Sequence, residues 1–147
     1  MKKLIPPILF LLCIATMVLI KNLIVIQEII PKPFNYFGIA LISTGLFMTI
    51  KVSKQFSKID TEIHTFKKPR KLVTCGLFQV SRNPVYLGFT ISLLGVWILL
   101  GTILPLVGCL IFIVITNYYY IPYEEETMEK IFGTDYKNYK SKVRRWI

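Results

Sequence analysis

Apolar residues in this chain come in blocks that basic, polar segments separate. Two uncharged runs of 17 residues, Leu4 to Ile20 and Phe34 to Ile50, each end at a lysine. A third run covers residues 85–123, which is 39 residues without a charge. One helix of that length would measure about 58 Å, roughly twice the hydrocarbon thickness of a bilayer. The third run must therefore fold back, near Gly101 and Pro105, into helices at 84–100 and 103–122.

This pattern predicts an all-α membrane protein with four transmembrane helices, the third and fourth forming a hairpin. At 147 residues, 54% of them hydrophobic, we expect one integral-membrane domain over residues 1–147. The first apolar run has no small-residue cleavage site before Lys21, so we interpret it as a retained helix and not a signal peptide. The second helix should continue to about Ser57.

The polar segments predict smaller elements. Residues 72–78 have the pattern of a short extended piece that turns at Gly76. Beyond Glu124 the chain is charged and amphipathic, and Gly133-Thr134 should break its helix. Aromatic residues then recur between lysines and arginines, which predicts a cytoplasmic interfacial segment with aromatic anchors, although a helix docked on a partner would show the same pattern. The recurring residues are Tyr136, Tyr139, Val143 and Trp146.

The basic residues predict the orientation. Four spans place 16 of the 18 lysines and arginines on one side, together with both termini and the 51–84 segment. The positive-inside rule makes that side the cytoplasm, so we expect a multi-pass protein of the inner or plasma membrane. The net charge is +10, but the basic residues flank apolar blocks, which indicates lipid headgroups and not nucleic acid as the partner.

The composition excludes several kinds of site. His64 is the only histidine, and the three cysteines are widely spaced, so neither a histidine-rich metal site nor a disulfide framework is expected. Walker, GxGxxG and GxSxG motifs are missing from the sequence. The sequence does not predict the oligomeric state.

Two polar clusters flank the third apolar block, Arg82-Asn83 before it and Glu124-Glu125-Glu126 after it. Each has a structural explanation, because Asn83 suits a helix N-cap, Pro84 suits a first turn, and glutamates stabilise a helix start. A hairpin would nevertheless bring the clusters to the same membrane face. Together they offer carboxylates for an ammonium, an amide for hydroxyls or base edges, and aromatic rings for a planar group. Such a set suits a zwitterionic, nucleoside-bearing cofactor.

The same stretches carry a resemblance to known proteins. Over roughly residues 70–147 the chain resembles the isoprenylcysteine carboxyl methyltransferase family and the related phospholipid N-methyltransferases. The resemblance implies an integral-membrane enzyme that uses S-adenosyl-L-methionine. The matching stretches are LVTCGLF from Leu72, RNPVYLG from Arg82, Glu124-Glu125, and FG, Tyr136, Tyr139 and VRRW from Phe132 onward.

The resemblance also implies roles for single residues. Arg82 would organise the site, and Tyr86 or Glu125 would relay a proton if the acceptor must lose one. Helix geometry, independently of the resemblance, places Glu126 about 200° around the helix from Glu124, so Glu126 should point to solvent. Cofactor-binding residues would be Lys71, Leu72, Val73, Phe78, Asn83, Pro84, Val85, Tyr86 and Glu124.

The methyl acceptor is less constrained. The eukaryotic carboxyl methyltransferases have an arginine one helical turn before the glutamate pair, where this chain has Tyr120, so Asn117 and Tyr120 would face the substrate. Asn83 replaces their histidine, which leaves cofactor binding expected but the substrate open. We expect methyl transfer to a lipophilic acceptor, isoprenylcysteine carboxyl methyltransferase-like. The alternatives are a phospholipid amine N-methyltransferase and a non-catalytic membrane scaffold.

Overall fold

The structure is a computed structural model that describes residues 5–24, 27–59 and 69–147. All regular elements in these residues are helical, and none of them is a strand. Residues 72–75 precede the 3₁₀ turn at Gly76–Gln79 without forming a strand; Cys75 is extended, and Gly76, with φ 65°, confirms the predicted turn. The elements are α1 (Pro6–Leu23), η1 (Phe34–Tyr36), α2 (Phe37–Ile59), η2 (Gly76–Gln79), α3 (Pro84–Leu100), α4 (Leu106–Ile115), η3 (Thr116–Tyr120) and α5 (Ile121–Lys142).

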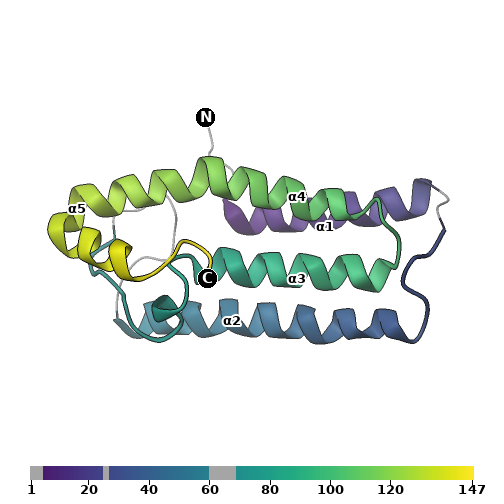
Figure 1. The fold of residues 1–147 in the computed structure, drawn as a ribbon, viewed down its shortest axis with the longest axis horizontal. Helices are drawn as coiled ribbons and strands as arrows, with labels where there is room; N and C mark the ends of the chain where they lie inside the picture. Colours follow the sequence, from purple (N-terminus) through teal and green to yellow (C-terminus); the bar gives the residue numbers. More distant parts are fainter. Residues whose placement is uncertain (1–4, 25–26, 60–68) are drawn as a thin grey trace.

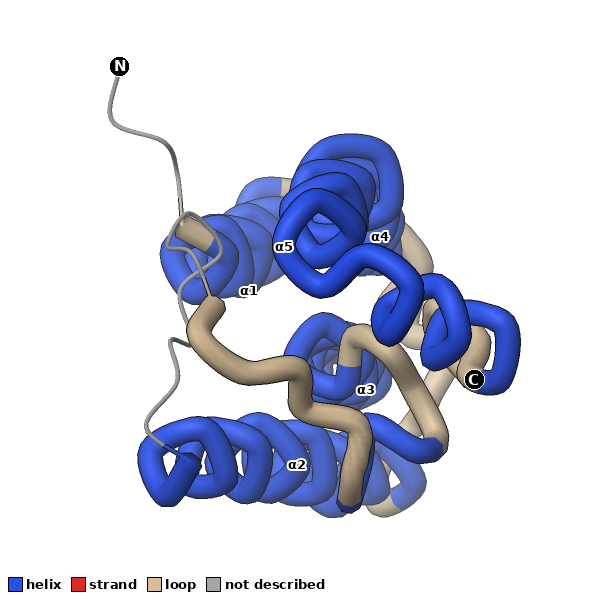
Figure 2. The backbone as a smooth tube through the Cα atoms, turned by 90° about the vertical axis from the view of Figure 1, so that its left-hand side faces the viewer, coloured by secondary structure: helices blue, strands red, loops and turns tan. Residues whose placement is uncertain are grey.

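The long helices lie side by side, with α3 between α2 and the pair formed by α1 and α4 (Figures 1 and 2). The backbones of α2 and α3 come into direct contact at glycines spaced seven residues apart on each helix. A Cβ atom on Gly38 would lie 2.3 Å from the carbonyl oxygen of Gly95, and one on Gly45 would lie 2.2 Å from that of Gly88. Small residues permit this approach, which is common between transmembrane helices.

Aromatic packing joins α1 to α3 and α4. The rings of Phe10 and Phe89 are stacked with centroids 4.6 Å apart, and Phe112 meets both rings edge-on. Gly108 leaves room on α4 for Met17, which is fully buried. This cluster fixes α1 against the hairpin of α3 and α4.

The bend of the predicted hairpin is confirmed at Gly101. This residue has φ 71°, a conformation that suits glycine, and ends α3 at Leu100 as expected. Its carbonyl accepts the N–H groups of Ile29 and Ile30, which ties the α1–α2 connector to this bend. The next helix begins at Leu106 and not at 103, and it does not end near 122, because α4, the π-helical turn η3 and α5 are continuous.

The predicted break at Gly133 appears as a kink inside α5. Gly133 has φ 51° and ψ −119°, and the helix turns back beside η2 after it (Figure 1). Tyr136 and Tyr139 are buried there, packed with Val73 and Phe78. The expectation that these tyrosines anchor an interfacial segment in lipid is therefore wrong, since they pack against the protein's own loop.

Among the residues that the structure describes, three helices are long and apolar enough to cross a membrane, at 6–23, 34–58 and 106–142, and α3 is a shorter apolar helix. The outer faces of α1 and α2 expose large apolar side chains, including Leu11, Leu19 and Phe47. Exposed apolar surface on this scale is typical of contact with lipid and not with water. Most of the charged residues that the structure describes gather at one end of the bundle, which we call the polar end, formed by residues 51–59, 69–83 and 124–147.

A candidate active site at the polar end of the bundle

A cavity of about 220 Å³ opens at the polar end, between the start of α1, the end of α2 and the start of α3. Most of its wall is apolar, with polar groups on the side of α3 and α5. Seven of the predicted site residues line it: Phe78, Arg82, Asn83, Pro84, Val85, Tyr86 and Glu124. Four further residues complete the wall: Ile5, Pro6, Pro7 and Phe56.

The side chains of Tyr86 and Glu124 meet in this cavity. The Tyr86 hydroxyl donates to Glu124 Oε1 at 2.8 Å, although the residues are 38 positions apart in the chain. Behind Tyr86 lies the ring of Tyr120, stacked at 6.2 Å and 1% exposed. The hairpin therefore brings the two predicted clusters together, as the sequence indicated.

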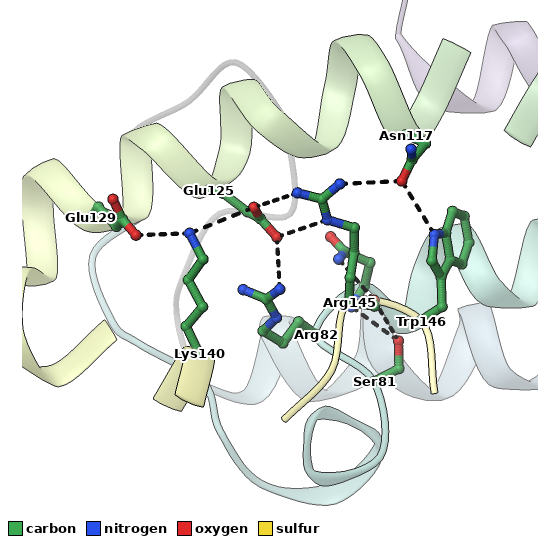
Figure 3. A network of polar contacts seen from close by, with 9 residues as sticks. Ser81, Arg82, Asn117, Glu125, Glu129, Lys140, Arg145 and Trp146 are labelled. Atoms are coloured by element: carbon green, nitrogen blue, oxygen red, sulfur yellow. Dashed lines mark hydrogen bonds and ion pairs between the residues drawn. The ribbon is translucent and has the colours of Figure 1, made fainter. Parts of the chain in front are cut away.

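Glu125 faces away from solvent, into a cluster of cations (Figure 3). Its Oε1 accepts from Arg82 Nη2 at 3.1 Å and from Arg145 Nε at 3.2 Å, and its Oε2 accepts from Arg145 Nη2 at 2.8 Å. Lys140 lies 3.8 Å from Oε2. Because Glu125 and Arg82 are each 9% exposed in their side chains, this pair is shielded from water. Guanidinium groups thus bond to both oxygens of the Glu125 carboxylate. This arrangement is typical of a carboxylate that holds segments of the structure together.

The segment before α3 is held by the C-terminal residues. Asn83 Nδ2 donates to the carbonyl of Arg145 at 3.0 Å, and Ser81 Oγ donates to the same carbonyl at 3.3 Å. The N–H of Arg82 donates to the carbonyl of Arg144. Asn83 occupies the N-cap position of α3 but makes no side-chain capping bond, so the predicted capping role of its side chain is wrong.

A tyrosine beside this network stays protonated at neutral pH. Tyr136 follows the kink of α5 and is 4% exposed. Burial and, to a smaller extent, the Glu125 carboxylate raise the pKa of Tyr136 to about 12, against the opposing effect of Arg82. Its neutral hydroxyl therefore adds no further negative charge around Arg82.

Comparisons with known proteins identify the family of the chain. The phospholipid methyltransferase family matches residues 34–135, more than half of the chain. The chain belongs to this family. No solved structure matches it significantly.

Curated relatives of this chain are found in plants and bacteria. The chain is 31% identical to protein-S-isoprenylcysteine O-methyltransferase B of Arabidopsis thaliana over 83% of its own length and 54% of the length of that protein. A probable protein-S-isoprenylcysteine O-methyltransferase of Oryza sativa subsp. indica is 28% identical over 74% of this chain and 58% of the relative. An uncharacterized protein of Haemophilus influenzae is 41% identical over 43% of this chain and over its own full length. The chain thus spans about half the length of the plant methyltransferases.

Six of the predicted site residues lie outside the cavity wall. Lys71 is exposed, whereas Leu72 and Val73 pack with Tyr136 and Tyr139 in the cluster behind Phe78. Asn117 accepts hydrogen bonds from Arg145 and from Trp146 Nε1, so its side chain serves the C-terminal residues. The remaining two are Tyr120, behind Tyr86, and Glu125, within the cation cluster.

Sequence reasoning missed the contributions of Arg145, Lys140 and Phe56. Phe56 precedes Ser57, where α2 was expected to end, so its apolar side chain gave no sign of a cavity. Arg145 belongs to the VRRW stretch that carried the resemblance, but the sequence did not show which residues its side chain contacts. The direction in which the chain turns at Gly133 determines these contacts, and the sequence predicted the helix break without its direction.

Proposed function

We propose that the protein is an S-adenosyl-L-methionine-dependent methyltransferase, isoprenylcysteine carboxyl methyltransferase-like, that acts on a lipophilic acceptor at the cytoplasmic membrane face. One observation carries the proposal: the Tyr86–Glu124 pair lies in a largely apolar cavity at the polar end of an apolar helical bundle. A site of this kind accepts a polar, charged donor and an amphiphilic acceptor together.

The residues of the cavity suit this cofactor. The carboxylate of Glu124 can pair with an ammonium group, while Phe56, Phe78 and Tyr86 offer aromatic surfaces to a planar base. When bound, the cofactor supplies a methyl group on a sulfonium that is already reactive. The task of the protein is then to align donor and acceptor and to exclude water, which the apolar wall around Pro6, Pro7 and Val85 would do.

Proton handling depends on the acceptor. A carboxylate acceptor needs no base, whereas an amine or phenol must lose a proton. Tyr86 can pass a proton to Glu124 through the 2.8 Å hydrogen bond, which makes this pair the candidate relay. Glu125 is less suited, because guanidinium groups engage both of its oxygens.

The proposed topology has four membrane-spanning helices, α1, α2, α3 and α4 with its continuation, and both termini in the cytoplasm. Its support is the 16-to-2 division of basic residues between the two sides of the membrane that the sequence predicts. Reporter fusions after Lys32 and after Ile147 should report opposite sides of the membrane. Fusions that report the same side would contradict this topology.

Labelling of membranes tests the activity. Membranes that contain the wild-type protein should transfer label from methyl-labelled S-adenosyl-L-methionine to a lipid-soluble product, and membranes with Glu124→Gln should transfer much less. Alkaline release of the label would indicate a methyl ester, and stable label in a phospholipid fraction would indicate an amine acceptor. A wild type that transfers no label and binds no S-adenosylhomocysteine would support the non-catalytic scaffold instead.

A further inference from the structure

We propose that Arg145 is a positioning residue of this site, and that residues 143–147, which we call the C-terminal strap, hold the first turn of α3 in the geometry that binds the methyl donor. The inference rests on the proposed function. It assigns to the strap a role in ligand binding, although neither Arg145 nor any other strap residue lines the cavity.

Arg145 connects three segments of the chain through its side chain and its backbone (Figure 3). Its guanidinium donates to both oxygens of Glu125 and, through Nη1, to Asn117 Oδ1 at 3.2 Å. Its carbonyl accepts the side chains of Ser81 and Asn83. One residue thus links the beginning of α5, the π-helical turn and the segment before α3.

These segments carry the two polar walls of the cavity. Asn83 leads directly into the first turn of α3, which contains Tyr86, and Glu125 directly follows Glu124. The distance between Tyr86 and Glu124 therefore depends on how the segments are held. Release of the strap would let the walls separate without removing any residue that touches the ligand.

The chemistry of the contact requires arginine. A planar guanidinium can bond to a carboxylate with two nitrogens and to Asn117 with the third, whereas a lysine ammonium is a compact charge on a flexible stem. Arg145→Lys would keep the charge beside Glu125 but lose the three-way connection. Arg144 provides a matched control, because its side chain is exposed and its bond to Arg82 is made by its carbonyl, which a substitution retains.

Calorimetry with S-adenosylhomocysteine on the full chain in detergent tests the role in binding. Loss of charge-assisted hydrogen bonds predicts binding about ten- to a hundred-fold weaker for Arg145→Gln. We expect Arg145→Lys to bind about tenfold more weakly while its melting temperature stays like that of the wild type. A loss of stability alone would not produce this combination, because it would lower the melting temperature as well. Arg144→Gln should bind within about twofold of the wild type.

Fluorescence of Trp146 reports on the strap without any cofactor. The chain has two tryptophans, so Trp97→Phe leaves Trp146 as the only tryptophan, whose emission can be excited selectively over that of the tyrosines. Trp146 Nε1 donates to Asn117 in the docked strap. In this background Arg145→Gln and Arg145→Lys should shift the emission to longer wavelength and increase quenching by acrylamide, whereas Arg144→Gln should change neither.

The outcomes separate the two proposals. Unchanged Trp146 emission in both Arg145 variants would overturn the strap inference whether or not the protein binds the cofactor. Wild-type affinity in Arg145→Lys and Arg145→Gln would also overturn it, as would an equal loss in Arg144→Gln, which would assign the effect to surface charge. A wild type that does not bind S-adenosylhomocysteine would instead contradict the proposed function.

Discussion

The α2–α3 interface and the polar end hold the chain together by different means. Between α2 and α3, four glycines let the backbones touch, and the contact depends on the absence of side chains. At the polar end, Glu125, Arg82 and Arg145 join distant segments through charged side chains. The first arrangement tolerates no added atom but is independent of charge, whereas the second depends on each partner being present. The candidate site lies where the rigid pair of helices meets the charged cluster.

The largest effect should come from filling the glycine contact. In Gly45→Leu the new Cβ would lie 2.2 Å from the carbonyl oxygen of Gly88, a backbone atom that cannot move aside alone. We expect the free energy of unfolding to fall by more than about 5 kcal/mol, at the exceptional end for a single substitution. Thermal unfolding in detergent would measure this. Phe47→Leu, at an exposed position on the same helix, is the control, and equal melting temperatures for both variants would contradict the close packing.

The next effect should come from removing the charge of Glu125. Glu125→Gln would leave the buried guanidinium of Arg82 without its counter-charge and would also weaken the hold on Arg145. Breaking one partner of a buried ion pair costs about 3–5 kcal/mol. Chemical unfolding in mild detergent can measure the loss, with Glu126→Gln at an exposed position as the control. A loss no greater than that of the control would show that the cluster is screened by solvent.

A smaller effect should follow from one hydrogen bond behind the cavity. The Tyr139 hydroxyl donates to the carbonyl of Phe78 at 2.6 Å, and both residues are buried. Tyr139→Phe leaves that carbonyl without the bond at a cost of about 1–3 kcal/mol. The melting temperature should fall while the helix content, measured by circular dichroism, stays the same. An unchanged melting temperature would mean that the hydrogen bond between Tyr139, in the part of α5 after Gly133, and Phe78 of η2 does not stabilise the protein.

The two regions also differ in how well the sequence predicted them. The pattern of apolar blocks gave α3 its bounds and the bend at Gly101, because helix length and bilayer thickness leave few alternatives. The convergence of Tyr86 and Glu124 followed from the hairpin. The positions of Arg145, Tyr136 and Tyr139 did not follow, since they depend on the direction in which the chain turns at Gly133. Asn83 fitted a local capping rule, but its side chain bonds to a residue 62 positions away.

The most direct test of the account is the affinity for S-adenosylhomocysteine of Glu124→Gln compared with Glu126→Gln. Glu124 lines the cavity, whereas Glu126 is exposed and pairs with Lys130, as predicted for a side chain that points to solvent. Loss of a charge-assisted bond should weaken binding by Glu124→Gln about ten- to a hundred-fold, and calorimetry in detergent should show nearly wild-type binding by Glu126→Gln. Equal losses in the two variants would mean that bulk negative charge, and not a contact with Glu124, attracts the ligand, and would contradict the placement of the cofactor between α3 and α5.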